Sequence, residues 1–197
     1  MSVILDNNNL IYQEYFDKST ARILPVPYSC KQWDGEGLPD IVKFITKKWN
    51  GKLIFGGSSL LHHLYFSDED WGEKDYDLWS CTCVIDEILI YLQSMQDKDK
   101  IIFEDPIICN NYFQKYTGVN IIYNINFNDI KLQLLKLDKF YCIDQGPYKA
   151  FIDHIDFSFL KILYDGNMVC YYTHDLNKVK EKKGTWIQLN KFTESFF

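Results

Sequence analysis

The chain has 197 residues, of which 47% are hydrophobic and 17% aromatic, and its formal net charge is -6 at pH 7. This length and apolar content suffice for one sizeable hydrophobic core but not for two. The acidic balance argues against extensive nucleic-acid binding, which needs a dense basic surface, although it leaves room for a local basic groove.

The cysteine spacing and hydropathy narrow the cellular setting. None of the six cysteines has the two-residue spacing of a zinc knuckle, so we expect no structural zinc. No apolar run reaches transmembrane length and no signal peptide is recognised, which predicts a protein without a membrane partner. We therefore expect a cytoplasmic protein with reduced thiols, with a virus-encoded protein inside a host cell as one form of this expectation.

Helices and strands alternate in the predicted elements of the first half. Residues 1–20 are polar and are expected to form an irregular N-terminal arm. Apolar residues over 40–49 have helical spacing, with Asp40 as the expected N-cap. The elements expected next are a strand over 52–55, a helix over 58–66, an acidic loop over 67–74, a strand over 76–84 and a helix over 86–96.

Strands dominate the second half. Asp165 and Gly166 are typical of a hairpin turn, here joining predicted strands over 155–164 and 168–172. The other elements expected are strands over 101–103, 119–125 and 130–137 and a basic helix over 176–183. This order predicts an α+β fold with a single mixed β-sheet and helices packed on it. We expect one domain over 1–197, with its core roughly over 50–172.

Two carboxylates and two glycines form the motif most suggestive of chemistry. Asp75 and Asp77 lie one residue apart on a predicted strand, so their side chains point to the same face, roughly 6.5 Å apart. Gly56 and Gly57 precede the helix predicted to begin at Ser58, where glycine backbone and free N–H groups can approach a phosphate. Oxygen ligands suit Mg²⁺, so the motif predicts a site for a magnesium-bound triphosphate. Solvent-facing carboxylates and a simple tight turn are the alternatives.

The order and spacing of these motifs resemble the nucleotidyltransferase-fold superfamily, which includes DNA polymerase beta, CCA-adding enzymes and small antitoxin nucleotidyltransferases. The matching segments are Phe55-Gly56-Gly57-Ser58 and Asp75-Tyr76-Asp77-Leu78, with Ile155-Asp156-Phe157 as the third. The stretch from Gly56 to Asp77 is particularly similar to the CCA-adding type. Two departures, a long interval before Asp75 and the absence of a basic residue after the glycines, prevent the substrate class from being carried over.

The resemblance implies a mechanism. Asp75, Asp77 and Asp156 would hold two Mg²⁺ (or Mn²⁺) ions and activate a hydroxyl, while Gly56, Gly57 and Ser58 would bind the triphosphate of ATP or another nucleoside triphosphate. The enzyme would transfer a nucleoside monophosphate to a protein, tRNA or nucleotide hydroxyl and release pyrophosphate. Asp153 is the alternative to Asp156, and a buried structural carboxylate is an equal interpretation of Asp156.

Two other functions remain open from the sequence. The chain could be a catalytically inactive member of the same fold that acts as a binding or inhibitor protein. It could also be a magnesium-dependent nuclease, because Asp129-Ile130-Lys131 has the Asp-x-Lys form of some nuclease strands. We rank the nuclease last, since such triplets arise readily by chance. The lack of a Gly-x-Ser-x-Gly elbow argues against a Ser-His-Asp hydrolase.

Overall fold

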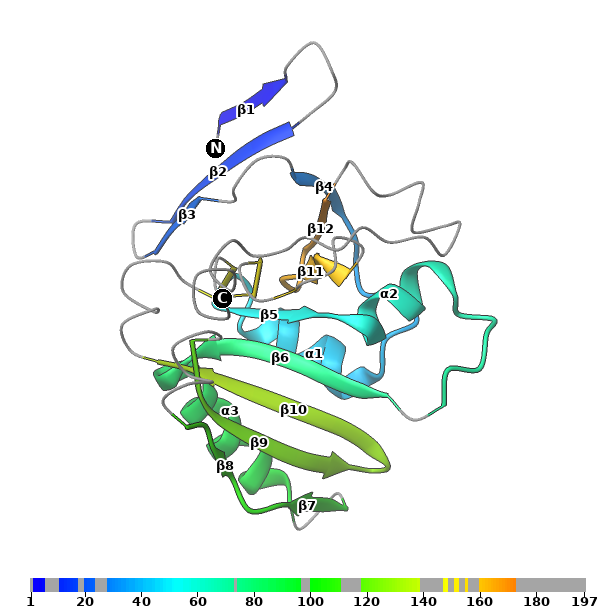
Figure 1. The fold of residues 1–197 in the computed structure, drawn as a ribbon, viewed down its shortest axis with the longest axis vertical. Helices are drawn as coiled ribbons and strands as arrows, with labels where there is room; N and C mark the ends of the chain where they lie inside the picture. The colour runs from blue at the N-terminus through cyan, green and yellow to red at the C-terminus, as the bar shows by residue number, and fades with distance from the viewer. Residues whose placement is uncertain are drawn as a thin grey trace, which may run out of the picture.

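The computed structural model describes residues 2–5, 11–17, 20–23, 28–72, 74–96, 100–110, 118–138, 147–148, 151–152, 155 and 160–172. In this part of the chain it is an α+β protein, with one large mixed sheet, a smaller sheet and three helices (Figure 1). The α+β class and the mixed sheet agree with the prediction from the sequence. None of the described helices is long and apolar enough to span a membrane.

The large sheet has the strand order β4-β12-β11-β5-β6-β10-β9-β7, and β8 also pairs with β9. Among these pairs β6 and β10 run parallel, and the others are antiparallel. The parallel pair lies in the middle of the sheet, where both neighbours protect it. The strands are β4 (Tyr28–Gln32), β5 (Leu53–Gly56), β6 (Asp75–Cys81), β7 (Ile101–Phe103), β8 (Ile107–Ile108), β9 (Val119–Phe127), β10 (Ile130–Leu137), β11 (Ile162–Tyr164) and β12 (Met168–Tyr172).

Three helices, α1 (Asp40–Lys48), α2 (Ser58–Tyr65) and α3 (Thr82–Met95), supply the apolar side chains of the larger core. Alternate residues of the central strands, such as Phe55 and Leu78, face these helices and are fully buried. In Figure 1, α1 and α3 lie behind the sheet. Pro39 rather than Asp40 is the N-cap of α1, and Asp40 begins the helix, where its charge favours the helix dipole.

The opposite face of the sheet carries a second, smaller core. Ile54, Trp79 and Leu163 lie on it, and Tyr148 and Phe151 cover it. Because side chains alternate along β6, Asp75 and Asp77 share this face with Trp79. This face of the sheet therefore has an apolar end, which Tyr148 and Phe151 cover, and a polar end, which holds the two carboxylates.

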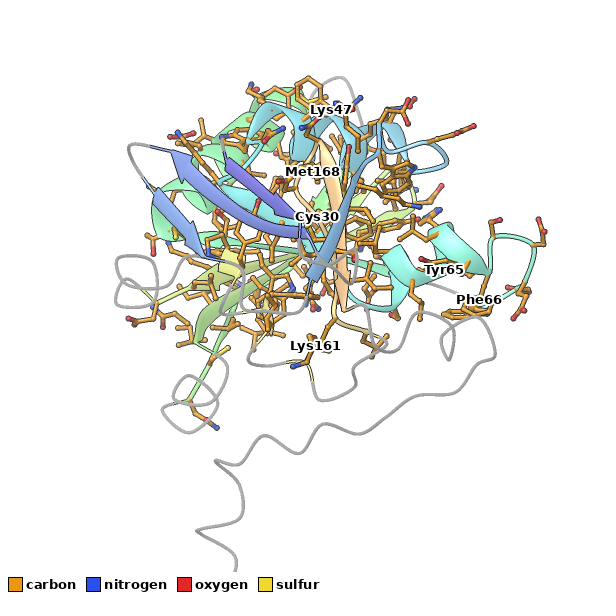
Figure 2. All side chains as sticks on the ribbon, turned by 90° about the horizontal axis from the view of Figure 1, so that it is seen from above. Cys30, Lys47, Tyr65, Phe66, Lys161 and Met168 are labelled. Carbon is orange, nitrogen blue, oxygen red and sulfur yellow. A yellow bond between two sulfur atoms is a disulfide. The ribbon has the colours of Figure 1, made fainter. Side chains whose placement is uncertain are left out.

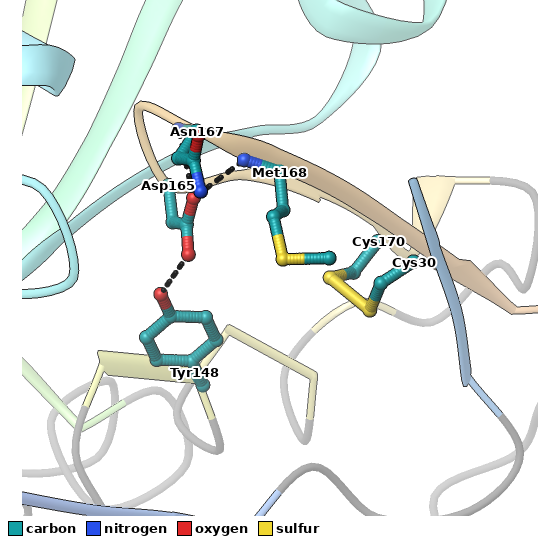
Figure 3. The surroundings of a disulfide bond; sticks show 6 residues. All are labelled: Cys30, Tyr148, Asp165, Asn167, Met168 and Cys170. Atoms are coloured by element: carbon teal, nitrogen blue, oxygen red, sulfur yellow. Dashed lines mark hydrogen bonds between the residues drawn. A yellow bond between two sulfur atoms is a disulfide. The ribbon is translucent and has the colours of Figure 1, made fainter. Parts of the chain in front are cut away.

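A disulfide joins Cys30 on β4 to Cys170 on β12, directly opposite each other in the antiparallel register (Figure 3). The expectation of reduced thiols is therefore wrong for this pair; among the described cysteines, Cys83 and Cys109 are exposed and half-buried thiols outside any disulfide. The sequence could not reveal the bond because 140 residues separate the two cysteines. Beside the bond, Asp165 accepts hydrogen bonds from the Tyr148 hydroxyl at 2.9 Å and from the turn amides, which fixes the predicted β11–β12 hairpin.

Three boundaries differ from the prediction. The strand expected over 76–84 ends at Cys81, and α3 begins at Thr82 rather than at 86. The strand expected over 155–164 is described only as β11, over 162–164. Residues expected to form an irregular arm include β1 (Ser2–Leu5) and β2 (Ile11–Asp17), which form an antiparallel sheet with β3 (Thr20–Ile23). The helix expected over 176–183 lies outside the described residues.

Candidate active site

Gly57 and Asp77 form the centre of the candidate site. In the antiparallel pair β5–β6, Gly56 lies directly opposite Asp77, so the glycine turn at the end of β5 meets the carboxylate on β6. Gly57 has φ +88° and ψ −159°, a combination that is essentially restricted to glycine. A Cβ atom added to Gly57 would lie 3.2 Å from Oδ2 of Asp77. The sequence motifs that are 20 residues apart are thus neighbours in space.

The N-terminus of α2 opens beside this carboxylate. Gly57 is the N-cap residue and, as a glycine, supplies no side-chain cap to the helix. The intrahelical hydrogen bonds begin with the amide of Leu61, which donates to the Gly57 carbonyl at 3.2 Å, so the amides of residues 58 to 60 precede the first bond. Such amides and the helix dipole favour a bound anion, and Ser58 is exposed next to them.

Ser59 connects the helix to the carboxylate strand. Its hydroxyl donates a hydrogen bond to the backbone carbonyl of Asp75, and its side chain is buried. The sequence interpretation treated Ser59 only as a position where a basic residue was missing. Its structural role is to hold the start of α2 against the start of β6, which fixes the glycine turn relative to the two carboxylates.

Figure 2 labels Tyr65 and Phe66, which mark the other end of α2, where the chain enters the loop before β6. There, Nε2 of His63 forms a hydrogen bond with the Tyr76 hydroxyl at 3.1 Å. Burial, with the charges of His62 and Lys74, lowers the pKa of His63 to about 4, so this imidazole is neutral at pH 7. His62 and His63 therefore pack and hydrogen-bond at the end of α2.

Asp77 is a half-buried carboxylate on β6. Burial, with a smaller contribution from the charge of Asp75, raises the pKa of Asp77 to about 7. Within the described part of the chain, no donor reaches it with a hydrogen bond or an ion pair. Asp75 is exposed at the start of β6. A divalent cation beside both residues would remove the cost of ionising Asp77, so their hard oxygen atoms fit a magnesium ion.

The neighbouring strand does not supply another carboxylate at this point. In the parallel pair β6–β10, Lys131 lies opposite Asp75 and Gln133 lies opposite Asp77. The Gln133 amide donates a hydrogen bond to Oδ1 of Asn124 on β9 at 3.0 Å. A polar row of amide, amide, carboxylate and glycine thus crosses four strands. This row could not be predicted from local sequence patterns, because the register of a parallel pair is set by contacts between segments far apart in the chain.

Gly56 has a packing role. A Cβ atom at Gly56 would lie 2.4 Å from the ring of Phe151, which is fully buried and packs edge-on against Trp79 with ring centroids 5.6 Å apart. The ring fills the space over Gly56 through which backbone approach to a phosphate was predicted. Of the two glycines, Gly57 is therefore the one whose missing side chain leaves space beside Asp77.

The third predicted ligand, Asp156, lies outside the described residues, as do its alternative Asp153 and the adjacent His154. Among the described residues, no group of three or more histidine, cysteine, aspartate or glutamate side chains could hold a metal ion. The structure thus brings Asp75, Asp77, Gly57 and Ser58 together, and the position of Asp156 stays a prediction. Asp129 of the nuclease motif has φ +69° and belongs to the exposed β9–β10 turn.

No protein-family model matches the chain, and no curated protein matches its sequence. The resemblance to nucleotidyltransferases therefore depends on the motif residues and on their arrangement. The observations that bear on function are those of the site itself: a glycine turn, the start of a helix and a pair of carboxylates on one face of a mixed sheet.

Proposed function

We propose that the chain is a metal-dependent nucleotidyltransferase, which transfers a nucleoside monophosphate from a nucleoside triphosphate to a hydroxyl group and releases pyrophosphate. The observation that carries this proposal is the contact between the Gly57 turn and the Asp77 carboxylate, with Asp75 on the same strand face. It supports the proposal because a phosphate-binding helix start and a cation-binding carboxylate pair are both needed to hold a magnesium-bound triphosphate, and here they adjoin.

Each residue has a role in this proposal. Asp75 and Asp77 hold the cation that grips the triphosphate, and Asp156 completes the set that activates the acceptor hydroxyl. The amides that begin α2, with the Ser58 hydroxyl, bind the phosphates. Gln133 and Asn124 do not ligate the metal; their mutual hydrogen bond keeps the face beside Asp77 polar. The acceptor is a protein, tRNA or nucleotide hydroxyl, and the base preference is open.

A cytoplasmic location belongs to the same proposal, because nucleoside triphosphates are abundant there. The Cys30–Cys170 disulfide is the observation against it, since disulfides are uncommon in that compartment. Treating intact cells with a thiol-alkylating reagent and counting the alkylated cysteines of the protein tests whether this disulfide exists in the cell. Two cysteines that escape alkylation would argue against a reducing compartment.

A second candidate is a nucleotide-binding member of the fold that performs no transfer. One observation favours it: the positions of β10 beside Asp75 and Asp77 carry Lys131 and Gln133, so the described strands offer two carboxylates and not three. Such a protein would bind a metal–nucleotide complex and serve as a binding or inhibitor protein. It differs from the enzyme only in the chemical step.

Calorimetric titration tests the proposed site. We expect the wild type to bind a nucleoside triphosphate with a non-cleavable α,β-bridge in the presence of Mn²⁺, and Asp77→Ala to lose at least tenfold in affinity. Asp105→Ala, which removes an exposed carboxylate outside the site, is the matched control and should bind like the wild type. If Asp77→Ala and the wild type bind the analogue equally well, Asp77 is not part of a metal–triphosphate site and the proposed site is wrong. Pyrophosphate release from ordinary triphosphates then separates the enzyme from the binding protein.

A further inference from the structure

A cleft with a volume of about 330 Å³ lies next to the carboxylate pair, on the side away from Gly57. It is lined by Lys74, Lys100, Ile102, Asn126, Asp129 and Lys131. Its volume is at the lower end of the range for small-molecule sites and matches a single nucleotide rather than a polymer. None of these residues has a part in the triphosphate site described above.

The strand registers place this cleft on the same sheet face as Asp75 and Asp77. Lys131 on β10 pairs with Asp75 on one side and with Asn126 of β9 on the other. Asn126 in turn pairs with Ile102 of β7. Paired residues project to the same face of a sheet, so the cleft spans the three strands β7, β9 and β10 and ends at Lys131, the neighbour of Asp75. Lys74 directly precedes Asp75.

The side chains that line the cleft carry a net positive charge, and the carboxylates of Asp75 and Glu104 lie at its edge. Three of its six lining residues are lysines and one is an aspartate, in a protein whose formal net charge is -6. Asp129 lies 4.0 Å from Lys100, but both side chains are largely exposed, so the pair neutralises little of the local field. Three ammonium groups around a small cleft attract a phosphate group.

The cleft also has features that suit a nucleoside. Ile102 offers an apolar wall and is 50% exposed. Asn126 lines the cleft, and its side-chain amide donates a hydrogen bond to Glu104 at 3.4 Å. An amide and an apolar surface are the groups that commonly contact a base, whereas the lysines suit its phosphate. Phosphate-binding residues thus lie on both sides of the carboxylates: the start of α2 on one and the lysines on the other.

We propose that the acceptor is a nucleotide, bound in this cleft with its phosphate on Lys74, Lys100 and Lys131 and its base against Ile102. This inference rests on the proposed function and narrows its acceptor to a mononucleotide. In the reaction, a hydroxyl oxygen of the acceptor bonds to the α-phosphorus of the triphosphate while the bond from that phosphorus to pyrophosphate breaks. The hydroxyl proton leaves to solvent, and no oxidant or reductant takes part.

The test is a titration of the full chain with AMP in EDTA, followed by NMR or calorimetry. Lys100→Gln/Lys131→Gln is expected to weaken AMP binding at least tenfold, and Ile102→Thr to weaken it several-fold. Lys43→Gln/Lys47→Gln on α1 removes the same charge from the helix-covered side and should bind AMP like the wild type. Adenosine, without a phosphate, should bind much more weakly than AMP.

The result that would overturn the inference is equal AMP binding by the wild type and the cleft double variant, or displacement of AMP by equimolar inorganic phosphate. A second titration keeps this failure distinct from failure of the proposed function. Binding of the Mn²⁺–triphosphate analogue should depend on Asp77 and not on Lys100 or Lys131. If binding of the triphosphate analogue does not depend on Asp77 while AMP binding still depends on Lys100 and Lys131, the cleft binds a nucleotide but the proposed transferase site is absent.

Discussion

The backbone of Gly57 lies against the carboxylate of Asp77, so close that a single added carbon atom would be 3.2 Å from Oδ2. This relationship joins the turn after β5 to the middle of the neighbouring strand. It makes Gly57 a position where side-chain size and backbone conformation both matter, and it ties the phosphate-binding half of the proposed site to its metal-binding half.

Gly57→Ala should therefore destabilise the fold by roughly 1–3 kcal/mol, because φ +88° with ψ −159° strains any residue with a Cβ atom. It should also weaken binding of the triphosphate analogue, since the methyl group crowds Asp77. Gly72→Ala is the matched control: Gly72 has φ +69° but nothing within 4 Å of its added Cβ. Urea denaturation measures the stability of both variants, and calorimetric titration measures their affinity for the triphosphate analogue. If Gly57→Ala binds the analogue as tightly as Gly72→Ala, Gly57 does not lie beside the bound phosphates.

Asp77 should make the metal-free protein less stable as the pH rises. Its folded-state pKa, about 7, lies above the ordinary value of 3.8, so the folded state binds the extra proton between these values. The stabilisation is complete below pH 3.8 and is lost as the pH rises through 7. Asp77→Asn cannot ionise, so in EDTA it should be more stable than the wild type by roughly 2–4 kcal/mol at pH 8, with little difference at pH 4.

The control for this titration is Asp75→Asn, which leaves Asp77 in place. It should move the pH midpoint of the wild-type profile downwards, because the charge of Asp75 contributes to the raised pKa of Asp77. Chemical denaturation at a series of pH values measures both effects. A difference between Asp77→Asn and the wild type that is the same at pH 4 and pH 8 would show that the pKa of Asp77 is not raised in the folded protein.

Gly56 and Phe151 should show strong coupling in a double-mutant cycle. Gly56→Ala places a carbon atom 2.4 Å from the Phe151 ring and should be severely destabilising, while Phe151→Ala should cost about 3–5 kcal/mol through the cavity it leaves. In the double variant the methyl group occupies part of that cavity, so the combined cost should be smaller than the sum of the single costs by more than 1 kcal/mol. Additive costs would mean that the ring does not lie over Gly56.

Reduction of the Cys30–Cys170 bond should lower the free energy of unfolding by roughly 2–5 kcal/mol, because the bond closes a long loop in the unfolded chain. Thermal unfolding of the purified protein with and without dithiothreitol measures the effect. Cys30→Ser/Cys170→Ser should be insensitive to the reductant, whereas Cys83→Ser, which removes an exposed free thiol, should respond like the wild type. No response in the wild type would exclude the bond.

Local patterns in the sequence were sufficient to predict α1, β5, the start of α2 and the shared face of Asp75 and Asp77. The predicted boundary between β6 and α3 was wrong, because Thr82 and Val84 favour strands by intrinsic propensity. In the structure both residues belong to α3, and Val84 is buried in the core that the helices cover. The pairing of β10 with β6 could not be predicted, since it joins segments more than 50 residues apart. The Gln133 and Lys131 positions beside the carboxylates, and with them the lysine cleft, depend on that pairing.

The most direct test of the central claim is a titration with Mn²⁺ in the presence of the triphosphate analogue. Electron paramagnetic resonance measures the number of bound ions and their affinity from pH 5.5 to 8.5. Binding at the carboxylate pair should strengthen as the pH rises through about 7, because the cation needs Asp77 ionised. Asp77→Asn should abolish this pH-dependent binding. If Asp77→Asn binds Mn²⁺ with the same affinity and the same pH profile as the wild type, the carboxylate pair is not a metal site and the proposed transferase function fails.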